Sequence, residues 1–264
     1  MENFIRIIPK KGFEEWPQKL GQLGRVYHEA EYDTVKKGVR DASTVHMDQH
    51  NIKKLLERFN KDGLQFTPLR ISGYYQGFSH FHPTVKEGEP FYWYGCLTRT
   101  YKDGQKFKEA DLKGDHRVIG QMLGYPDCCV KYFEKTFPKV NYDPIWINLQ
   151  GEVQGWPECN QMLRYFGARI TGHLSCSPIC KATKVIGERW LDVMKKTDKE
   201  SAGMLYSLLS QKIIWNSYHG VIQVDTPYFL GLTSSFPYLE KPRIISWSSL
   251  PPKISKGRKI KTKK

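Results

Sequence analysis

Two short segments rich in metal-ligating side chains place the strongest constraint on how this chain can fold. The first is the adjacent pair Cys128-Cys129, and the second runs from His173 to Cys180 with the sequence HLSCSPIC. Each segment follows a turn and leads into a stretch with a helical pattern. Cysteine and histidine are the side chains that hold zinc in proteins. If the two segments hold one metal, the fold must bring two helix N-termini together.

The spacing within these segments allows two kinds of metal site. A zinc ion would take His173, Cys176 and Cys180, with Cys128 or Cys129 as the fourth ligand. An iron–sulfur cluster would instead take the four cysteines, because its irons are spread widely enough to accept adjacent thiolates. The adjacent pair slightly favours the cluster, since neighbouring side chains diverge and strain a single tetrahedral site. The sequence leaves zinc and the cluster as alternatives.

Thiol chemistry without a metal is a second interpretation. Cys128 or Cys129 at a helix N-terminus would feel its partial positive charge, which favours the thiolate. His116 or His173 would serve as the base for such a nucleophile, and Asp127 is a further acid or base candidate. These residues would make the protein a cysteine-nucleophile enzyme.

Packing alone is the third interpretation of the cysteines. Free cysteine is among the most buried residue types, so a single cysteine is best explained as part of the core. We apply this explanation to Cys96, which lies in an aromatic strand pattern, and favour it for Cys159. It explains less well five ligand-type residues at two turn-to-helix junctions, and metal binding is therefore preferred.

The two motifs also carry a resemblance. Residues 124–133, GYPDCCVKYF, and the HLSCSPIC segment resemble the signature of an uncharacterised, mainly archaeal family of unknown function (DUF483-like). The resemblance covers about residues 91–200 and implies no particular activity. This chain has Ser175 where such a family often has proline, a departure that leaves the ligand residues in place.

The order of sequence patterns predicts an α+β protein. Aromatic and β-branched runs flank a central region with helical spacing, which argues against a doubly wound sheet. We expect helices over residues 46–59, 115–124, 127–137, 157–167, 181–196 and 202–211, and strands over 69–75, 91–98, 169–174, 213–218 and 221–225. Residues 105–211 would form a central helical cysteine-bearing unit packed against antiparallel strands from both flanking regions, within a single domain spanning 1–252.

A basic tail dominates the charge of the chain. The formal net charge is +14, and half of this excess lies in residues 253–264, which carry seven basic and no acidic side chains. Such a segment predicts a disordered arm that contacts nucleic acid, with a solubilising terminus as the alternative. No apolar run is long enough to span a membrane and the first residues do not resemble a secretory signal, so we expect a cytoplasmic protein.

The leading hypothesis is an intracellular metal-binding protein with zinc or an iron–sulfur cluster on Cys128, Cys129, Cys176 and Cys180, and with His173 as a ligand or a supporting partner. It would extend to an enzyme that acts on nucleic acid or a small molecule. The alternatives are a metal-free cysteine enzyme and a non-catalytic nucleic-acid-binding protein with structural cysteines. Thiolates that share one zinc lie roughly 3.5 to 4 Å apart, so the hypothesis requires the two segments to converge.

Overall fold

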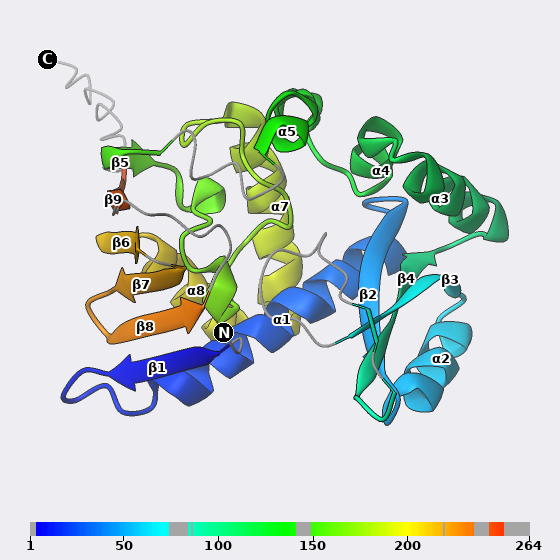
Figure 1. The fold of residues 1–264 in the computed structure, drawn as a ribbon, viewed down its shortest axis with the longest axis horizontal. Helices are drawn as coiled ribbons and strands as arrows, with labels where there is room; N and C mark the ends of the chain where they lie inside the picture. The colour runs from blue at the N-terminus through cyan, green and yellow to red at the C-terminus, as the bar shows by residue number, and fades with distance from the viewer. Residues whose placement is uncertain are drawn as a thin grey trace, which may run out of the picture.

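The computed structural model describes residues 4–73, 84–85, 87–140, 149–218, 220–234 and 243–250. Within these ranges the chain forms a six-stranded sheet and a three-stranded sheet, with helices packed on both (Figure 1). The α+β class is therefore confirmed. The basic tail, residues 253–264, lies outside the described residues.

The three-stranded sheet is antiparallel, with the order β2 (Ala42–Asp48), β4 (Phe91–Thr98) and β3 (Gln65–Gly73). One core joins it to α2 (Ile52–Lys61) and the end of α1, with Met47, Phe59 and Leu97 fully buried. A second core joins it to α3 (Tyr101–Lys113) and the helix after it. Helices thus cover both faces of the small sheet.

The six-stranded sheet has a mixed order. Its strands, from one edge to the other, are β1 (Ile5–Pro9), β8 (Phe229–Ser234), β7 (Val221–Asp225), β6 (Ile213–Tyr218), β9 (Arg243–Ser249) and β5 (Gly151–Gly155). All neighbours are antiparallel except β5 and β9, which are parallel. Trp215 and Trp247 from this sheet lie in the largest core cluster with residues of α7 (Lys181–Thr197) and α8 (Lys199–Leu209).

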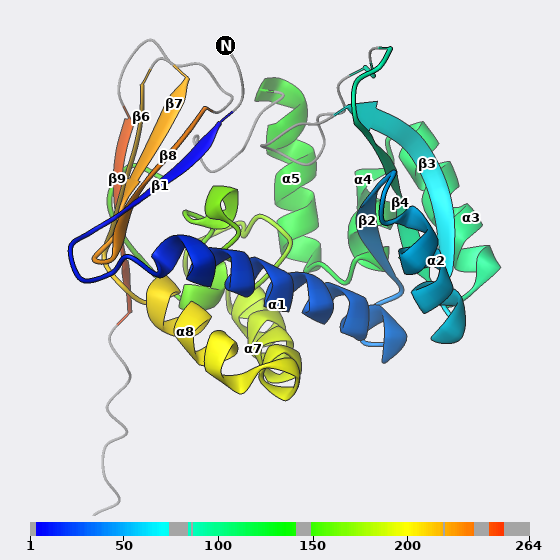
Figure 2. The ribbon, with the colours of Figure 1, turned by 90° about the horizontal axis from the view of Figure 1, so that it is seen from below.

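Helix α1 (Trp16–Lys36) links the two sheets. Leu23 and Tyr27 belong to the core of the large sheet, whereas Tyr32 and Val35, further along the helix, belong to a core of the small sheet. Figure 2 shows α1 crossing from one sheet to the other and α5 (Asp127–Val140) standing between them. The space between the sheets is where the cysteine segments meet.

Several sequence predictions of secondary structure are confirmed. The predicted strands over 91–98, 213–218 and 221–225 correspond to β4, β6 and β7, and β6 pairs with β7 as a hairpin. The strand predicted over 69–75 is part of β3, with residues 74 and 75 outside the described ranges. Helices α7 and α8 lie close to their predicted spans.

Other predictions of secondary structure are wrong, for reasons that depend on packing. The helix predicted from residue 46 begins only at Ile52, because the preceding residues pair with β4. The helix predicted over 157–167 is two short 3-10 turns, Pro157–Cys159 and Arg164–Phe166. Between them Asn160 accepts a bond from the backbone of Met162, a local bond that competes with a helix.

Three further differences concern the central unit. Residues 151–155 form the strand β5 within the predicted helical unit. The segment 169–174 is irregular rather than extended. Helix α5 continues past Pro138 to Val140, although proline removes one backbone donor and disfavours a helix interior. None of the helices in the described ranges is long and apolar enough to cross a membrane.

Candidate metal centre

A tight change of direction delivers the first cysteine pair. Asp115 is the N-cap of helix α4 (His116–Met122), and its side chain accepts a bond from the backbone N–H of Val118. Gly124 then takes a left-handed φ of 71°, and Tyr125-Pro126 redirects the chain into α5. Cys128 and Cys129 consequently lie in the first turn of α5.

The second cysteine segment ends at the start of α7. Cys180 is the N-cap of this helix, and its Sγ accepts a bond of 3.4 Å from the backbone N–H of Thr183. The backbone N–H of Cys180 bonds to the carbonyl of Ser177, which closes a turn between the two cysteines of the segment. Cys176 lies before this turn, and its backbone N–H donates to Cys129 Sγ at 3.4 Å.

The four sulfurs converge on one point. Cys128 Sγ lies 3.7 Å from Cys180 Sγ, and Cys129 Sγ lies 3.8 Å from the same atom. Side chains of adjacent residues are expected to diverge, but the sulfurs of Cys128 and Cys129 are only 3.9 Å apart. All four Sγ atoms, including that of Cys176, lie within 4.8 Å of one another. The convergence required by the hypothesis is confirmed, and the cysteine cluster could hold a metal ion.

The surroundings of the cysteine cluster bear on its charge. Burial raises the pKa of the Cys129 thiol far above its ordinary value and that of Cys176 to about 12. Burial also opposes ionisation of Cys180. Hydrogen bonds from Thr183 and the neighbouring thiols outweigh it and lower the pKa of Cys180 to about 7. Without a cation, burial therefore keeps Cys129 and Cys176 protonated, and a bound metal ion would supply the charge that stabilises their thiolates.

His173 lies beside the cysteine cluster but outside the set of converging atoms. Its Nε2 lies 2.9 Å from the hydroxyl oxygen of Thr183, and that hydroxyl lies 3.3 Å from Cys129 Sγ. Burial lowers the pKa of His173 to about 3, so the ring is neutral. A neutral ring that donates from Nε2 to Thr183 leaves the threonine proton free to point at the sulfur. His173 thus supports Cys129 through a hydroxyl.

The other candidate residues have different surroundings. Asp127 is exposed and forms an ion pair of 2.6 Å with Lys131, so its carboxylate faces solvent. The ring of His116 packs edge-on against Phe133 and Phe137, with 5.2 and 6.0 Å between the ring centroids. His116 also lines a cavity next to the cluster. Among the described residues, no hydrogen bond joins His116 to a cysteine. His116 is therefore not placed as the base of a Cys128 or Cys129 nucleophile.

The two remaining cysteines do not belong to the set of four converging sulfurs. Cys96 is fully buried in the small sheet, and burial raises its pKa to about 12. Cys159 is buried next to α7, where its thiol donates weakly to the carbonyl of Cys180, and burial raises its pKa to about 12 as well. Neither belongs to the converging set found among the described residues.

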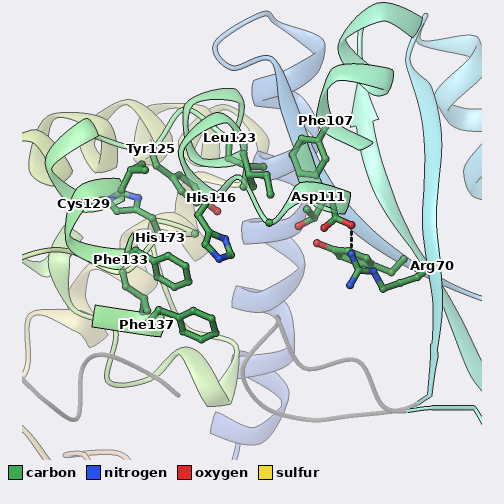
Figure 3. A pocket seen from close by; sticks show the side chains of 17 residues that line it. Arg70, Phe107, Asp111, His116, Leu123, Tyr125, Cys129, Phe133, Phe137 and His173 are labelled. Carbon is green, nitrogen blue, oxygen red and sulfur yellow. Dashed lines mark hydrogen bonds and ion pairs between the residues drawn. The ribbon is translucent and has the colours of Figure 1, made fainter. Parts of the chain in front are cut away.

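A cavity of about 380 Å³ adjoins the cysteine cluster and was not predicted from the sequence (Figure 3). Cys129 and His173 form part of its wall, and an ion pair between Arg70 and Asp111 lies at the far side. Its aromatic lining comprises Tyr94, Phe107, His116, Tyr125, Phe133 and Phe137. The lining comes from β3, β4, α3, α4, α5 and the segment around His173, so no local sequence pattern could have revealed it.

Comparison with protein-family models, curated proteins and solved structures finds no match for this chain. What the cysteine cluster can do follows from its own geometry.

Proposed function

We propose that this protein binds one zinc ion through Cys128, Cys129, Cys176 and Cys180. The separation of the sulfurs carries the proposal. A tetrahedral ion with zinc–sulfur bonds of about 2.3 Å places its ligand sulfurs about 3.8 Å apart. The sulfur separations of 3.7, 3.8 and 3.9 Å among Cys128, Cys129 and Cys180 match this value, and Cys176 Sγ lies within 4.8 Å of all three.

The same distances favour a single ion over an iron–sulfur cluster. The four thiolates of a cluster are divided between two or four irons, so thiolates on different irons lie further apart than the ligands of one ion. Zinc is preferred to other single ions because thiolate ligands in a tetrahedral arrangement are its usual structural environment. Two backbone N–H groups, from Cys176 and Thr183, point at sulfurs and would offset part of the thiolate charge.

The proposed role of the ion is structural. Four protein ligands fill a tetrahedral shell and leave no position for a reactive water. The ion would fasten the start of α5, which continues from the helices of the small sheet, to the start of α7, which packs on the large sheet. It would also hold Cys129 in the wall of the neighbouring cavity. Zinc would thus fix the two halves of the molecule relative to each other.

The proposed location follows from the same chemistry. All six cysteines carry free thiols, and four of them must be reduced to bind a metal. We therefore infer that the protein works in a reducing compartment, where such thiols persist.

Metal analysis of the protein purified without oxygen tests this proposal. We expect about one zinc per chain and a colourless solution. Cys180→Ser and Cys128→Ser should each lose most of the zinc, whereas Cys96→Ser, which changes a buried cysteine away from the cluster, should retain it. A wild-type protein without stoichiometric metal, or a brown protein containing iron, would refute the zinc proposal. Equal zinc in Cys180→Ser and wild type would refute the ligand set.

A further inference from the structure

A second cavity of about 530 Å³ adjoins the first. The two share Thr44, Tyr125 and Gly172 in their linings, so they meet at one place between the small sheet and α1. Tyr27, Glu31 and Arg169 line the second cavity near this junction. The first cavity forms the aromatic end of this pair, beside the cysteine cluster, and the second forms the polar end, beside α1.

A buried group of charged side chains forms the wall of the polar end. The carboxylate of Glu31 accepts a bond of 3.0 Å from the hydroxyl of Tyr27 and lies 3.8 Å from the guanidinium of Arg40. Arg169 lies over the ring of Tyr27, with 4.3 Å from its guanidinium carbon to the ring centroid. Two guanidinium groups therefore face one carboxylate, which leaves an excess of one positive charge.

Some donors of these arginines have no acceptor within the described part of the chain. Nε of Arg169 and Nη1 of Arg40 are both buried without a hydrogen-bond partner there. Arg40 is itself 4% exposed and stacks on Trp190. Burying an uncompensated charge with unpaired donors is costly. Arg169 lines the second cavity, so an anionic group placed there would balance the excess positive charge of the two arginines.

Gly172 lies against two phenol hydroxyls where the linings of the cavities meet. A Cβ at this position would lie 2.7 Å from the hydroxyl oxygen of Tyr27 and 3.2 Å from that of Tyr125. The Tyr27 hydroxyl already donates its proton to Glu31, so of the two it is the Tyr125 hydroxyl that could donate to a ligand oxygen here. A side chain at residue 172 would displace these hydroxyls.

The first cavity suits a flat, apolar group. The rings of Phe133 and Phe137 are nearly parallel, at 10°, with centroids 4.7 Å apart. Figure 3 shows His116 beside these two rings, with Leu123 and Phe107 further along the lining. Aromatic walls favour aromatic ligands through stacked and edge-on contacts. A volume of about 380 Å³ is within the range of small-molecule sites.

We propose that the two adjoining cavities open into each other and together bind an aromatic carboxylate, with its ring among Phe133, Phe137 and His116 and its carboxylate at Arg169. A carboxylate carries one negative charge, which matches the single excess positive charge of the arginines. A phosphate monoester would bring nearly two charges close to the Glu31 carboxylate, which would repel the second. This site is additional to the zinc centre, and its test does not depend on which metal the cysteines hold.

Calorimetric titration of the full chain with matched probes tests the proposed site. The probes are 2-naphthoate, its uncharged amide 2-naphthamide, and 2-naphthyl phosphate. We expect the carboxylate to bind at least about tenfold more tightly than the amide, the effect of one hydrogen-bonded charge pair. Equal binding of acid and amide would overturn the proposal. Tighter binding of the phosphate would overturn the assignment to a carboxylate.

Variants of Arg169 locate the contact. Arg169→Gln should weaken binding of 2-naphthoate at least about tenfold and leave binding of 2-naphthamide unchanged. Arg169→Lys should keep part of the preference for the acid over the amide. Arg164→Gln is the matched control, because Arg164 also stacks on a tyrosine, Tyr165, but lines neither cavity. An unchanged preference in Arg169→Gln would refute the assigned contact.

Zinc measured in every sample separates the two proposals. Arg169→Gln should keep the zinc content of the wild type while it loses the preference for the acid. A wild-type protein that contains no zinc but still binds 2-naphthoate more tightly than 2-naphthamide would contradict the zinc proposal and leave the ligand proposal standing.

Discussion

Two buried polar groups lie close to the space between the sheets, and they differ in how their charges are balanced. Around Glu31 the chain supplies opposite charges itself. Burial raises the pKa of this carboxyl, but His28, Arg40 and Arg169 outweigh burial and lower it to about 2. The cysteine cluster contains only groups that become negative on ionisation, and burial raises the pKa of Cys129 and Cys176. The first group has its opposite charges within the chain, whereas the proposed metal ion would supply those of the second.

Loss of the metal is expected to have the largest effect. Because the thiolates need a cation, Cys180→Ser and chelation of the wild type should both lower the free energy of unfolding. The loss is about 4 kcal/mol when free zinc exceeds its dissociation constant a thousandfold. Urea unfolding with and without chelator measures it. If chelation does not change the unfolding midpoint of the wild type, the cysteine cluster is complete without an ion and the comparison fails.

Glu31→Gln is expected to cost about 3 kcal/mol at neutral pH, from the lowered pKa of this carboxyl. A carboxyl with a lowered pKa stabilises the fold above its unfolded pKa, near 4.5, and loses that contribution as the pH falls toward about 2. The gap between wild type and variant in unfolding free energy should therefore close between pH 4.5 and pH 2. A gap that stays constant over this interval would show that Glu31 is not held ionised.

The same variant separates the two groups. Glu31→Gln should retain about one zinc per chain, because no residue around Glu31 belongs to the cysteine cluster. Loss of zinc on this substitution would show that the two groups depend on each other.

Loss of the hydrogen bonds around the sulfurs should have a smaller effect, on zinc affinity. Thr183→Val removes the hydroxyl between His173 and Cys129 with little change in shape, and should weaken zinc binding about tenfold without changing its stoichiometry. Competition with a chromogenic chelator measures this affinity. Thr197→Val is the control, since Thr197 lies on the same helix and bonds only to a helix carbonyl. Equal zinc affinity in both variants would show that His173 and Thr183 do not support zinc binding by the cysteine cluster.

The smallest effect is expected at Cys96. This thiol is as deeply buried as any in the cysteine cluster, but it lies in the small sheet with no second sulfur nearby in the described structure. Cys96→Ala should cost about 1 kcal/mol from the small cavity it leaves, with zinc content unchanged. Thermal unfolding and metal analysis of the same sample check both values. A fall in zinc would show that burial rather than convergence distinguishes the cysteines.

The convergence of the cysteines could be predicted because each pair belongs to a local signal. Turn residues before α5 and α7 place cysteines at helix starts, and these signals span only a few positions. The position of His173 relative to the metal could not be predicted in this way. Thr183, an unremarkable residue in the first turn of α7, lies between His173 and Cys129 and makes the histidine a supporting group.

Features that depend on distant contacts escaped the sequence analysis. Residues 46–48 have spacing that suits a helix, but pairing with β4 makes them a strand. The charged group around Glu31 combines α1 with Arg40 and Arg169, and no spacing pattern relates these positions. The cavities are likewise built from elements far apart in the chain. Sequence therefore indicated the four converging cysteines but not the cavities beside them.

X-ray absorption at the zinc edge of the purified protein tests the central claim most directly. The account predicts one zinc per chain with four sulfur neighbours at about 2.3 Å and no nitrogen or oxygen neighbour. A first shell that includes nitrogen would show that His173 is a ligand after all. An iron edge with short iron–iron distances would contradict the account and identify a cluster in place of the single ion.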